Sequence, residues 1–379
     1  MKATLCSCSM DRMVTHPKSD DLAPEEVQLV FCFGAKAVIE AKDAYTMLRT
    51  KYPSAQIIIC STAGEIYDTE VFDHTLTVTA LQFEHTPIET RMVRIDEYLS
   101  SYAAGQALVR QFPGKDLAYL LVFSDGSMVN GSELVQGMNE VAHDQLLITG
   151  GLAGDGPDFR HTLVGLNDRP SAGLVVAVGF YGQHLCVHHG TRGGWEMFGP
   201  ERTVTKSTGN VLYEINGKNA LDLYKLYLGP DAAKLPGSAL LFPLAIKKDA
   251  ESELVVRTIL SIDELSGSMT FAGDIPEGAQ VRFMRANFDR LTDAAYHAAL
   301  DTKKSGEQPP KLALLISCVG RKLILQGRTE EEVEAIDEVF NQQTILTGFY
   351  SYGEISPFVD GTSCQLHNQT MTITTFSER

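Results

Sequence analysis

Four histidines lie within thirty residues of each other near the middle of the chain. They are His161, His184, His188 and His189. Segment 183–190 has the residue types of a strand, in which successive side chains point to opposite faces. Leu185, Val187 and His189 would then share a face, with His188 on the other. A neutral imidazole in apolar surroundings suits a metal or a haem iron, and it equally suits an ordinary hydrogen bond in the core.

An arginine and the single tryptophan follow this strand, at Arg192 and Trp195. A guanidinium binds carboxylates through paired hydrogen bonds, and an indole forms a broad apolar wall. We therefore expect these two residues to line a ligand pocket. A glycine turn with a packed tryptophan is the alternative that the sequence leaves open.

Three apolar runs end in small residues, a glycine and an acid. They are QIIICSTAGEIYD (56–68), LLITGGLAGDGPD (146–158) and TILTGFYSYGEISP (344–357). This recurrence indicates repeated α/β halves, although short runs of this kind also arise by chance. The acids Glu65, Asp155 and Glu354 are candidates for holding an ammonium group, or for capping turns. The glycines at 150–156 are not followed by GK[ST], which excludes a P-loop.

Support for catalysis is weak. The chain has no G-x-S-x-G elbow, and no histidine is adjacent to a candidate serine or cysteine. An enzyme with Cys60 or Cys318 as nucleophile is an alternative that would need a distant histidine. We expect that the protein is not an enzyme.

The charge balance excludes several classes of partner. Lys and Arg number 32 against 48 Asp and Glu, a formal net charge of −16. The basic residues are scattered, so we expect neither nucleic-acid binding nor docking to an anionic membrane. No run of about 18 apolar residues occurs, and the N-terminus lacks the apolar stretch of a signal peptide. The seven scattered cysteines fit reduced thiols, and we expect a cytoplasmic protein.

Hydrophobic periodicity predicts mixed α/β (α+β) architecture with two domains, each a central mixed sheet flanked by helices. The expected parts are a loose N-terminus (1–25), an N-terminal domain (26–200) and a C-terminal domain (201–379). Residues 35–52 fit one amphipathic helix, and Ser132 is placed to cap a helix over 132–144. Two strands over 171–180 and 183–190 fit a β-hairpin.

At these motifs the chain resembles the FIST-domain family, with N-terminal and C-terminal FIST regions. The N-terminal likeness rests on CSTAGEI (60–66), VFSDGSMVNGSELVQG (122–137), TGGLAGDG (149–156), LVGL (163–166) and SAGLVVAVGFYG (171–182). The C-terminal likeness rests on residues 204–229, FPLAI (242–246), FAGDIPEGAQVRFM (271–284), ISCVGR (316–321), TGFYSYGEISP (347–357) and HNQTMTIT (367–374). Together these segments cover almost the whole chain after residue 25.

The resemblance implies a sensory, ligand-binding module of signal transduction, usually bacterial. Stand-alone members similar to this chain bind haem, sense nitric oxide and modulate a partner histidine kinase or cyclic-di-GMP enzyme. The resemblance thus implies haem b, with His188 or His189 as the iron ligand. The sequence carries no kinase, GGDEF or EAL motif, so the output would pass through another protein. A homodimer is compatible with this interpretation.

Two further interpretations do not involve haem. In one, the protein binds a small amino-acid-like ligand. Arg192 would hold its carboxylate, and Glu65, Asp155 or Glu354 its ammonium group, with Tyr350 also counted among the ligand-binding residues. In the other, the chain is a scaffold that binds only a protein partner.

Overall fold

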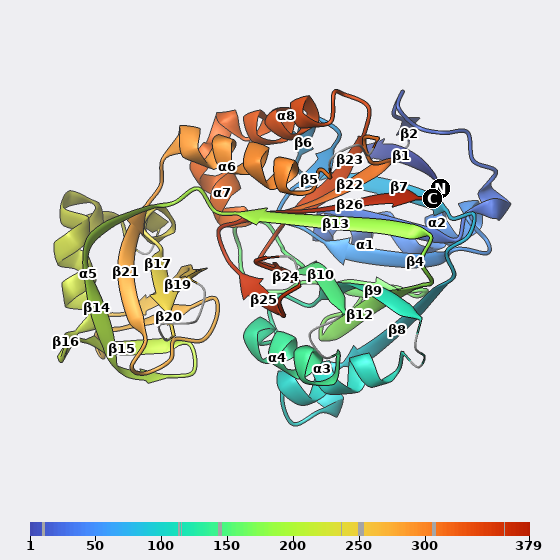
Figure 1. Ribbon diagram of the computed structural model, residues 1–379. Helices are drawn as coiled ribbons and strands as arrows, with labels where there is room; N and C mark the ends of the chain where they lie inside the picture. Colours follow the sequence, from blue (N-terminus) through green and yellow to red (C-terminus); the bar gives the residue numbers. More distant parts are fainter. Residues whose placement is uncertain are drawn as a thin grey trace.

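Three pairs of parallel apolar strands organise the fold. The pairs are β3 (Leu29–Gly34) with β4 (Gln56–Ser61), β9 (Leu117–Ser124) with β10 (Leu147–Leu152), and β22 (Leu312–Cys318) with β23 (Ile345–Ser351). Their near-continuous burial is typical of parallel strands covered on both faces. The computed structural model describes residues 1–9, 12–112, 114, 116–142, 146–235, 237–248, 254–304, 308–359 and 361–379 (Figure 1).

Each strand pair lies within a six-stranded sheet of the described residues. The first sheet has the order β11 (Val164–Leu166), β4, β3, β7 (Leu76–Gln82), β1 (Lys2–Ser9), β2 (Arg12–Thr15). The second has the order β25 (Cys364–His367), β24 (Gly353–Pro357), β10, β9, β12 (Leu174–Tyr181), β8 (Ile88–Arg94). The third has the order β13 (Leu185–Arg192), β26 (Met371–Glu378), β22, β23, β5 (Glu65–Tyr67), β6 (Glu70–Phe72).

Helices cover the outer face of each sheet, and the inner faces share a core. The helices are α1 (Lys36–Ala41) and α2 (Ala44–Lys51) on the first sheet, α3 (Ser101–Arg110) and α4 (Gly131–Ala142) on the second, and α6 (Phe288–Asp301), α7 (Val319–Leu325) and α8 (Glu330–Val339) with the third. One phenylalanine from each sheet meets in the centre. The ring centroids of Phe33 and Phe349 lie 4.8 Å apart, and those of Phe33 and Phe123 lie 5.7 Å apart. The expected mixed α/β architecture with helix-flanked sheets is confirmed.

An eight-stranded sheet stands to one side of the three others (Figure 1). Its path is β18 (Val255–Arg257), β17 (Leu244–Lys247), β21 (Gln280–Arg285), β14 (Glu196–Thr208), β15 (Val211–Ile215), β20 (Ser268–Phe271) and β19 (Ile259–Asp263), and β16 (Lys218–Asn219) pairs with β15. Helix α5 (Ala220–Leu228) packs on it around a separate apolar core. The chain enters this part from β13 and leaves it into α6, so it is an insertion within the third unit.

Each of the three parallel strand pairs sends the chain onward into a different sheet. After β4 the chain crosses to the third sheet as β5, which pairs with β23. After β10 it crosses to the first sheet as β11, which pairs with β4. After β23 it crosses to the second sheet as β24, which pairs with β10. The three recurrent sequence segments are these crossings, so the repeat joins three units in a closed ring.

Backbone hydrogen bonds at the crossings follow the same cyclic order. Ala63 N–H donates to Tyr350 O at 2.8 Å, Gly154 N–H to Ser61 O at 2.9 Å, and Tyr352 N–H to Leu152 O at 3.2 Å. In each segment the donor lies two residues after the acceptor. This spacing aligns the three segments residue by residue and places Glu65 and Glu354 at matching positions.

Two details differ from the expectations drawn from the sequence. Lys2–Ser9, expected to be loose, forms β1 because it pairs with β7 and buries Ala3 and Leu5. The helix expected over 35–52 is two helices, because Asp43 adopts a left-handed backbone with φ of 44°. Among the described residues no helix combines the length and apolar character needed to cross a membrane.

The expected hairpin between β12 and β13 is wrong. Strand β12 pairs with β8 and β9 in the second sheet, whereas β13 pairs with β26 in the third. The two strands are adjacent in sequence, but each pairs along its length with strands of a different sheet. The short connection at Tyr181-Gly182 therefore carries the chain between sheets rather than around a turn.

The strand pair in the third sheet depends on a glycine. Gly348 has φ of +156°, and a Cβ there would lie 1.8 Å from Leu315 O. We expect Gly348→Ala to lower the free energy of unfolding by about 2–4 kcal/mol. The new Cβ would collide with a backbone carbonyl oxygen, which cannot rotate away as a flexible side chain could. Urea denaturation would measure this. Gly327→Ala is the control, because a Cβ there meets open space, and it should be neutral. Equal stabilities for the two variants would contradict the prediction.

Candidate functional site

A cleft of about 900 Å³ opens where the three units meet. Its walls begin directly after the carboxyl ends of β3, β4, β10 and β22. Residues 35–40, 62–65 and 73–74 come from the first unit, 155–161 from the second, and 319–329 from the third. Crevices at the carboxyl ends of parallel strands are the usual ligand sites of α/β sheets. The volume falls within the about 300–1,000 Å³ range of small-molecule pockets.

The cleft is lined by side chains of both charge signs. The basic residues are Lys36, Arg160 and Lys322, and the acids are Glu40, Glu65, Asp73, Asp155 and Asp158. Two imidazoles, His74 and His161, also line it. Such mixed polarity suits a ligand that carries a positive and a negative group, because each would face a partner of opposite sign.

Lys322 is a largely buried cation that lines the cleft. Its ammonium donates to Ala63 O at 3.0 Å and to the Asp73 carboxylate, and it lies 5.6 Å from the centroid of the Tyr350 ring. The side chain of Lys322 is only 16% exposed. Gly64 makes room for it, because a Cβ at Gly64 would lie 2.5 Å from Lys322 Nζ. Lys322 thus joins the first and third units at the base of the cleft.

Tyr352 holds the loop that carries Asp155. Its hydroxyl donates to Asp155 Oδ1 and accepts from the backbone N–H of Asp155 at 3.1 Å and of Phe159 at 3.0 Å. The rings of Phe159 and Tyr352 are stacked at 4.4 Å. Asp155 Oδ2 accepts from the N–H groups of Arg160 and His161. The carboxylate therefore stands at a fixed place on the wall of the cleft.

Glu65 and Glu354 play the same structural role in two units. Glu65 accepts from Thr62 and Thr75, and Glu354 accepts from Ser351 and Thr370. Both side chains are fully buried, and burial raises the pKa of Glu65 and raises that of Glu354 to about 8. Each carboxyl ties a crossing segment to the start of a long strand. Of the two, Glu65 lines the cleft.

The structure brings some of the expected ligand-binding residues together and leaves others apart. Glu65 and Asp155 line the cleft, and Tyr350 lies beneath Lys322. Arg192 instead pairs with Asp301 on α6, with Nε 2.7 Å from Oδ2 and the guanidinium half-exposed. Trp195 is buried in an apolar cluster and donates to Gln369 O at 2.8 Å. A packed tryptophan after a glycine turn is the alternative that describes this segment.

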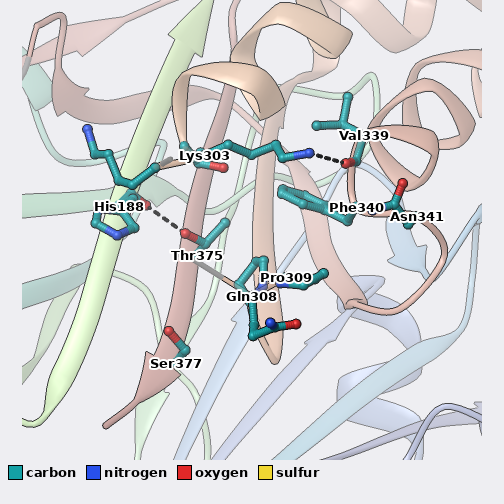
Figure 2. A pocket seen from close by; sticks show the side chains of 12 residues that line it. His188, Lys303, Gln308, Pro309, Val339, Phe340, Asn341, Thr375 and Ser377 are labelled. Atoms are coloured by element: carbon teal, nitrogen blue, oxygen red, sulfur yellow. Dashed lines mark hydrogen bonds between the residues drawn. The ribbon is translucent and has the colours of Figure 1, made fainter. Parts of the chain in front are cut away.

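His188 lies beside a much smaller cavity of about 90 Å³ (Figure 2). Figure 2 shows Lys303, which follows the end of α6, extending toward Val339, whose carbonyl accepts from its ammonium at 3.0 Å. Phe340 and Pro309 close the other sides. Pockets that hold drug-sized ligands have volumes of at least about 300 Å³, and a haem needs no less space. The residues around His188 therefore do not fit a haem in this conformation.

His189 points to the opposite side of β13 and is 6% exposed. It lies near His367, a buried imidazole that bonds to Ser356 O and whose pKa is lowered to about 4 chiefly by burial. His189 therefore lies buried between sheets, close to a second buried imidazole. Within the part of the chain that the structure describes, no group of three or more His, Cys, Asp or Glu side chains could hold a metal ion.

Both cysteines considered as nucleophiles are buried inside strands or at their ends. Cys60 is 0% exposed and Cys318 is 3% exposed. Burial raises the pKa of each thiol well above its usual value. A thiol held protonated and away from solvent is a poor nucleophile, since the thiolate is the reactive form.

Sequence analysis missed the residues that dominate the cleft. They are Lys322, Asp73, His74, Arg160 and the α1 residues at 36–40. Lys322 follows directly after ISCVGR (316–321), a strand end, and a charged residue just past a buried strand was an available signal. The signal was insufficient alone, because Lys322 and its partner Asp73 lie 249 residues apart in the sequence.

Known protein families and solved structures resemble most of the chain. A family model for the FIST N domain matches residues 28–218, and one for the FIST C domain matches residues 220–357. The structure of cyanuric acid hydrolase from A. caulinodans aligns with 94% of this chain and 92% of its own, at 8% identity and a TM-score of 0.37. A second cyanuric acid hydrolase structure covers 100% of this chain and 99% of its own, at 8% identity and a TM-score of 0.34. No curated protein matches the sequence.

Burial of Glu354 makes stability depend on pH. Below its ordinary pKa of 4.5 the carboxyl is protonated in both states, whereas up to about pH 8 only the unfolded chain ionises. Stability should therefore fall as pH rises across this window. We expect Glu354→Gln to reduce that fall by a few kcal/mol, measured by urea denaturation at about pH 5 and about pH 8. Glu334→Gln, on an exposed part of α8, controls for the change in net charge. An unchanged slope in Glu354→Gln would contradict the prediction.

Proposed function

The chain belongs to the FIST family, a family of sensory and signalling modules, and from this premise we propose that it senses a small amino-acid-like metabolite. The ligand occupies the cleft between the three units, and a partner protein reads the result. The observation that carries this proposal is the cleft itself. It offers about 900 Å³ at the carboxyl ends of the parallel strands and is lined by both cations and carboxylates.

The two ends of such a ligand have separate partners. Lys322 faces the ligand carboxylate, since its ammonium has three donors and the described structure uses two of them, for Ala63 O and Asp73. Asp155, which the second unit contributes to the cleft, faces the ligand ammonium. Arg192, our first expectation for the carboxylate, is engaged with Asp301 instead.

Ligand binding here acts on the arrangement of the units. The cleft takes side chains from all three, so a ligand that bridges Lys322 and Asp155 favours the arrangement in which these two groups are closest. A partner such as a histidine kinase or a cyclic-di-GMP enzyme would detect that shift. The proposal is one of binding without bond chemistry, and the buried, protonated thiols of Cys60 and Cys318 favour it over a thiol enzyme.

A screen of the standard amino acids by thermal unfolding, followed by calorimetric titration, tests this function. At a hundredfold excess over its Kd, a ligand should stabilise the protein by about 2.7 kcal/mol. We expect Lys322→Gln and Asp155→Asn each to weaken binding at least about tenfold, the loss of one charged contact. Arg192→Gln is the matched control and should bind like wild type. If Arg192→Gln loses affinity while Lys322→Gln keeps it, the cleft is not the site.

Haem-based nitric oxide sensing is the second candidate function. The family resemblance and the half-buried position of His188 beside a cavity favour it. When bound, haem b would supply an iron that takes up nitric oxide. His188 or His189 would hold the iron, but the 90 Å³ cavity would first have to widen at residues 302–304 and 308–310, which line it.

An absorption spectrum with and without added haemin tests the second function. Haem sensing predicts a sharp Soret band that shifts with nitric oxide and is lost in His188→Ala or His189→Ala. His184→Ala, on the exposed end of the same chain segment, is the control. A featureless spectrum in which haemin contributes only free-haem absorbance would eliminate this function and leave the metabolite proposal intact.

A further inference from the structure

A second groove of about 360 Å³ lies apart from the central cleft, between the eight-stranded sheet and the second sheet. One wall is formed by β17, β18 and the turn at 274–276, and the other by α4 and the start of β25. The insertion and the ring of three sheets therefore face each other across this groove. Its residues are distinct from those of the central cleft.

Arg257 lines the groove as a buried cation with incomplete bonding. The residue is only 7% exposed, and its Nη1 donates to Leu366 O at 2.9 Å and to Val256 O at 3.3 Å. Its Nε is buried and has no hydrogen-bond partner among the described residues. Within that same part of the chain, no carboxylate lies within ion-pair distance. Burial lowers the pKa of Arg257 to about 10, so the guanidinium is charged at neutral pH.

A second buried donor faces the same space. Ser132 is 7% exposed, and its hydroxyl has no partner in the described structure. The helix cap expected of Ser132 is supplied by Asn130, whose Oδ1 accepts from the N–H groups of Ser132 and Glu133. The Ser132 hydroxyl is therefore not needed for helix α4. It lies in the first turn, where the helix dipole is positive.

Gly273 lies between these two donors. A Cβ at Gly273 would lie 2.7 Å from Arg257 Nε and 3.0 Å from Ser132 Oγ. Both unpartnered groups therefore border one point in space, from opposite walls. A side chain at position 273 would collide with both groups.

The charges around the groove favour an anion. Among the described residues, Lys248 and Arg257 line it together with one carboxylate, that of Asp274, which accepts from Asn130 Nδ2 at 3.3 Å. A buried guanidinium without a carboxylate partner is costly, and an oxyanion that accepts from it removes the cost.

We propose that this groove is a binding site for a compact oxyanion, the phosphate or carboxylate group of a small metabolite, with Arg257 Nε and the Ser132 hydroxyl as its donors. The bound group links the insertion, through Arg257, to helix α4, through Ser132. It thereby fixes the eight-stranded sheet against the ring of three sheets. This site is independent of the proposed function of the central cleft.

Calorimetric titration of the full chain with inorganic phosphate, and separately with acetate, tests the proposal at constant ionic strength. We expect saturable binding of at least one probe, and the one bound identifies the anion class. Ser132→Ala should weaken it at least about fivefold, while thermal stability stays equal or rises because an unpartnered buried hydroxyl is removed. Thr258→Val is the matched control, since its hydroxyl is equally buried and unpartnered but lies outside the groove lining.

Arg257→Lys provides a second, charge-conserving variant and should also weaken binding, because lysine lacks the Nε donor. The proposal is overturned if neither probe shows saturable binding, or if both Ser132→Ala and Arg257→Lys bind like wild type. It is also overturned if Lys322→Gln abolishes binding while Ser132→Ala does not, since the anion would then occupy the central cleft. Failure of amino acids to bind the cleft leaves this result unaffected.

Discussion

The exchange of strands among the three sheets is the constraint on which the rest of the structure depends. No one of these sheets is complete in itself, because β5, β11 and β24 each finish a sheet that belongs to another unit. The three crossings also place the segments after β4, β10 and β23 around a common centre. The central cleft opens there, so its shape is a consequence of how the ring closes. A displacement of one unit changes two sheet edges as well as the cleft.

Hydroxyl-to-carboxyl bonds reinforce the ring in two of its three crossings. Thr62 with Glu65 in the first unit corresponds to Ser351 with Glu354 in the third. The second unit has Gly156 at the matching position and uses Asp125 instead, which accepts from the N–H of Gly173 just before β12. In each unit a carboxyl group therefore bonds to the backbone or side chain just before a long strand, although the residue that supplies it differs. The unit without the glutamate is also the one whose crossing loop lines the cleft with Asp155.

A fully buried ion pair supports the floor of the cleft. Arg321 and Glu332 are both 0% exposed, with Nη2 2.8 Å from Oε2. A buried pair is stable only when the remaining donors and acceptors are also satisfied. Arg321 donates further to Gly193 O and Leu291 O, and Glu332 accepts from Ser317 and Tyr350. These bonds fix α7, which carries Lys322, and the tyrosine beneath it. Arg321 ends the ISCVGR motif, which gives that motif a structural meaning.

The sequence predicted what depends on local spacing and missed what depends on pairing across the ring. The helix predicted over 132–144 forms as α4, because its buried positions recur at helical spacing. The β12–β13 hairpin failed because strand partners far along the chain outcompete the neighbour. The same limit applies to the site. Glu65 and Asp155 were identified because each follows an apolar strand. Lys322 meets them only through the crossing of β5 onto β23, which no local pattern contains.

Size and polarity together favour a polar metabolite over haem. The cavity beside His188 holds about 90 Å³, whereas the central cleft holds about 900 Å³ but is lined by eight charged side chains. Covering those charges with an apolar macrocycle would cost several kcal/mol for each ion left without a partner. Apolar burial returns only about 25 cal/mol per Å². A zwitterion avoids that cost, because its two charges replace the water around Lys322 and Asp155. The proposed function therefore calls for a ligand that carries its own pair of opposite charges.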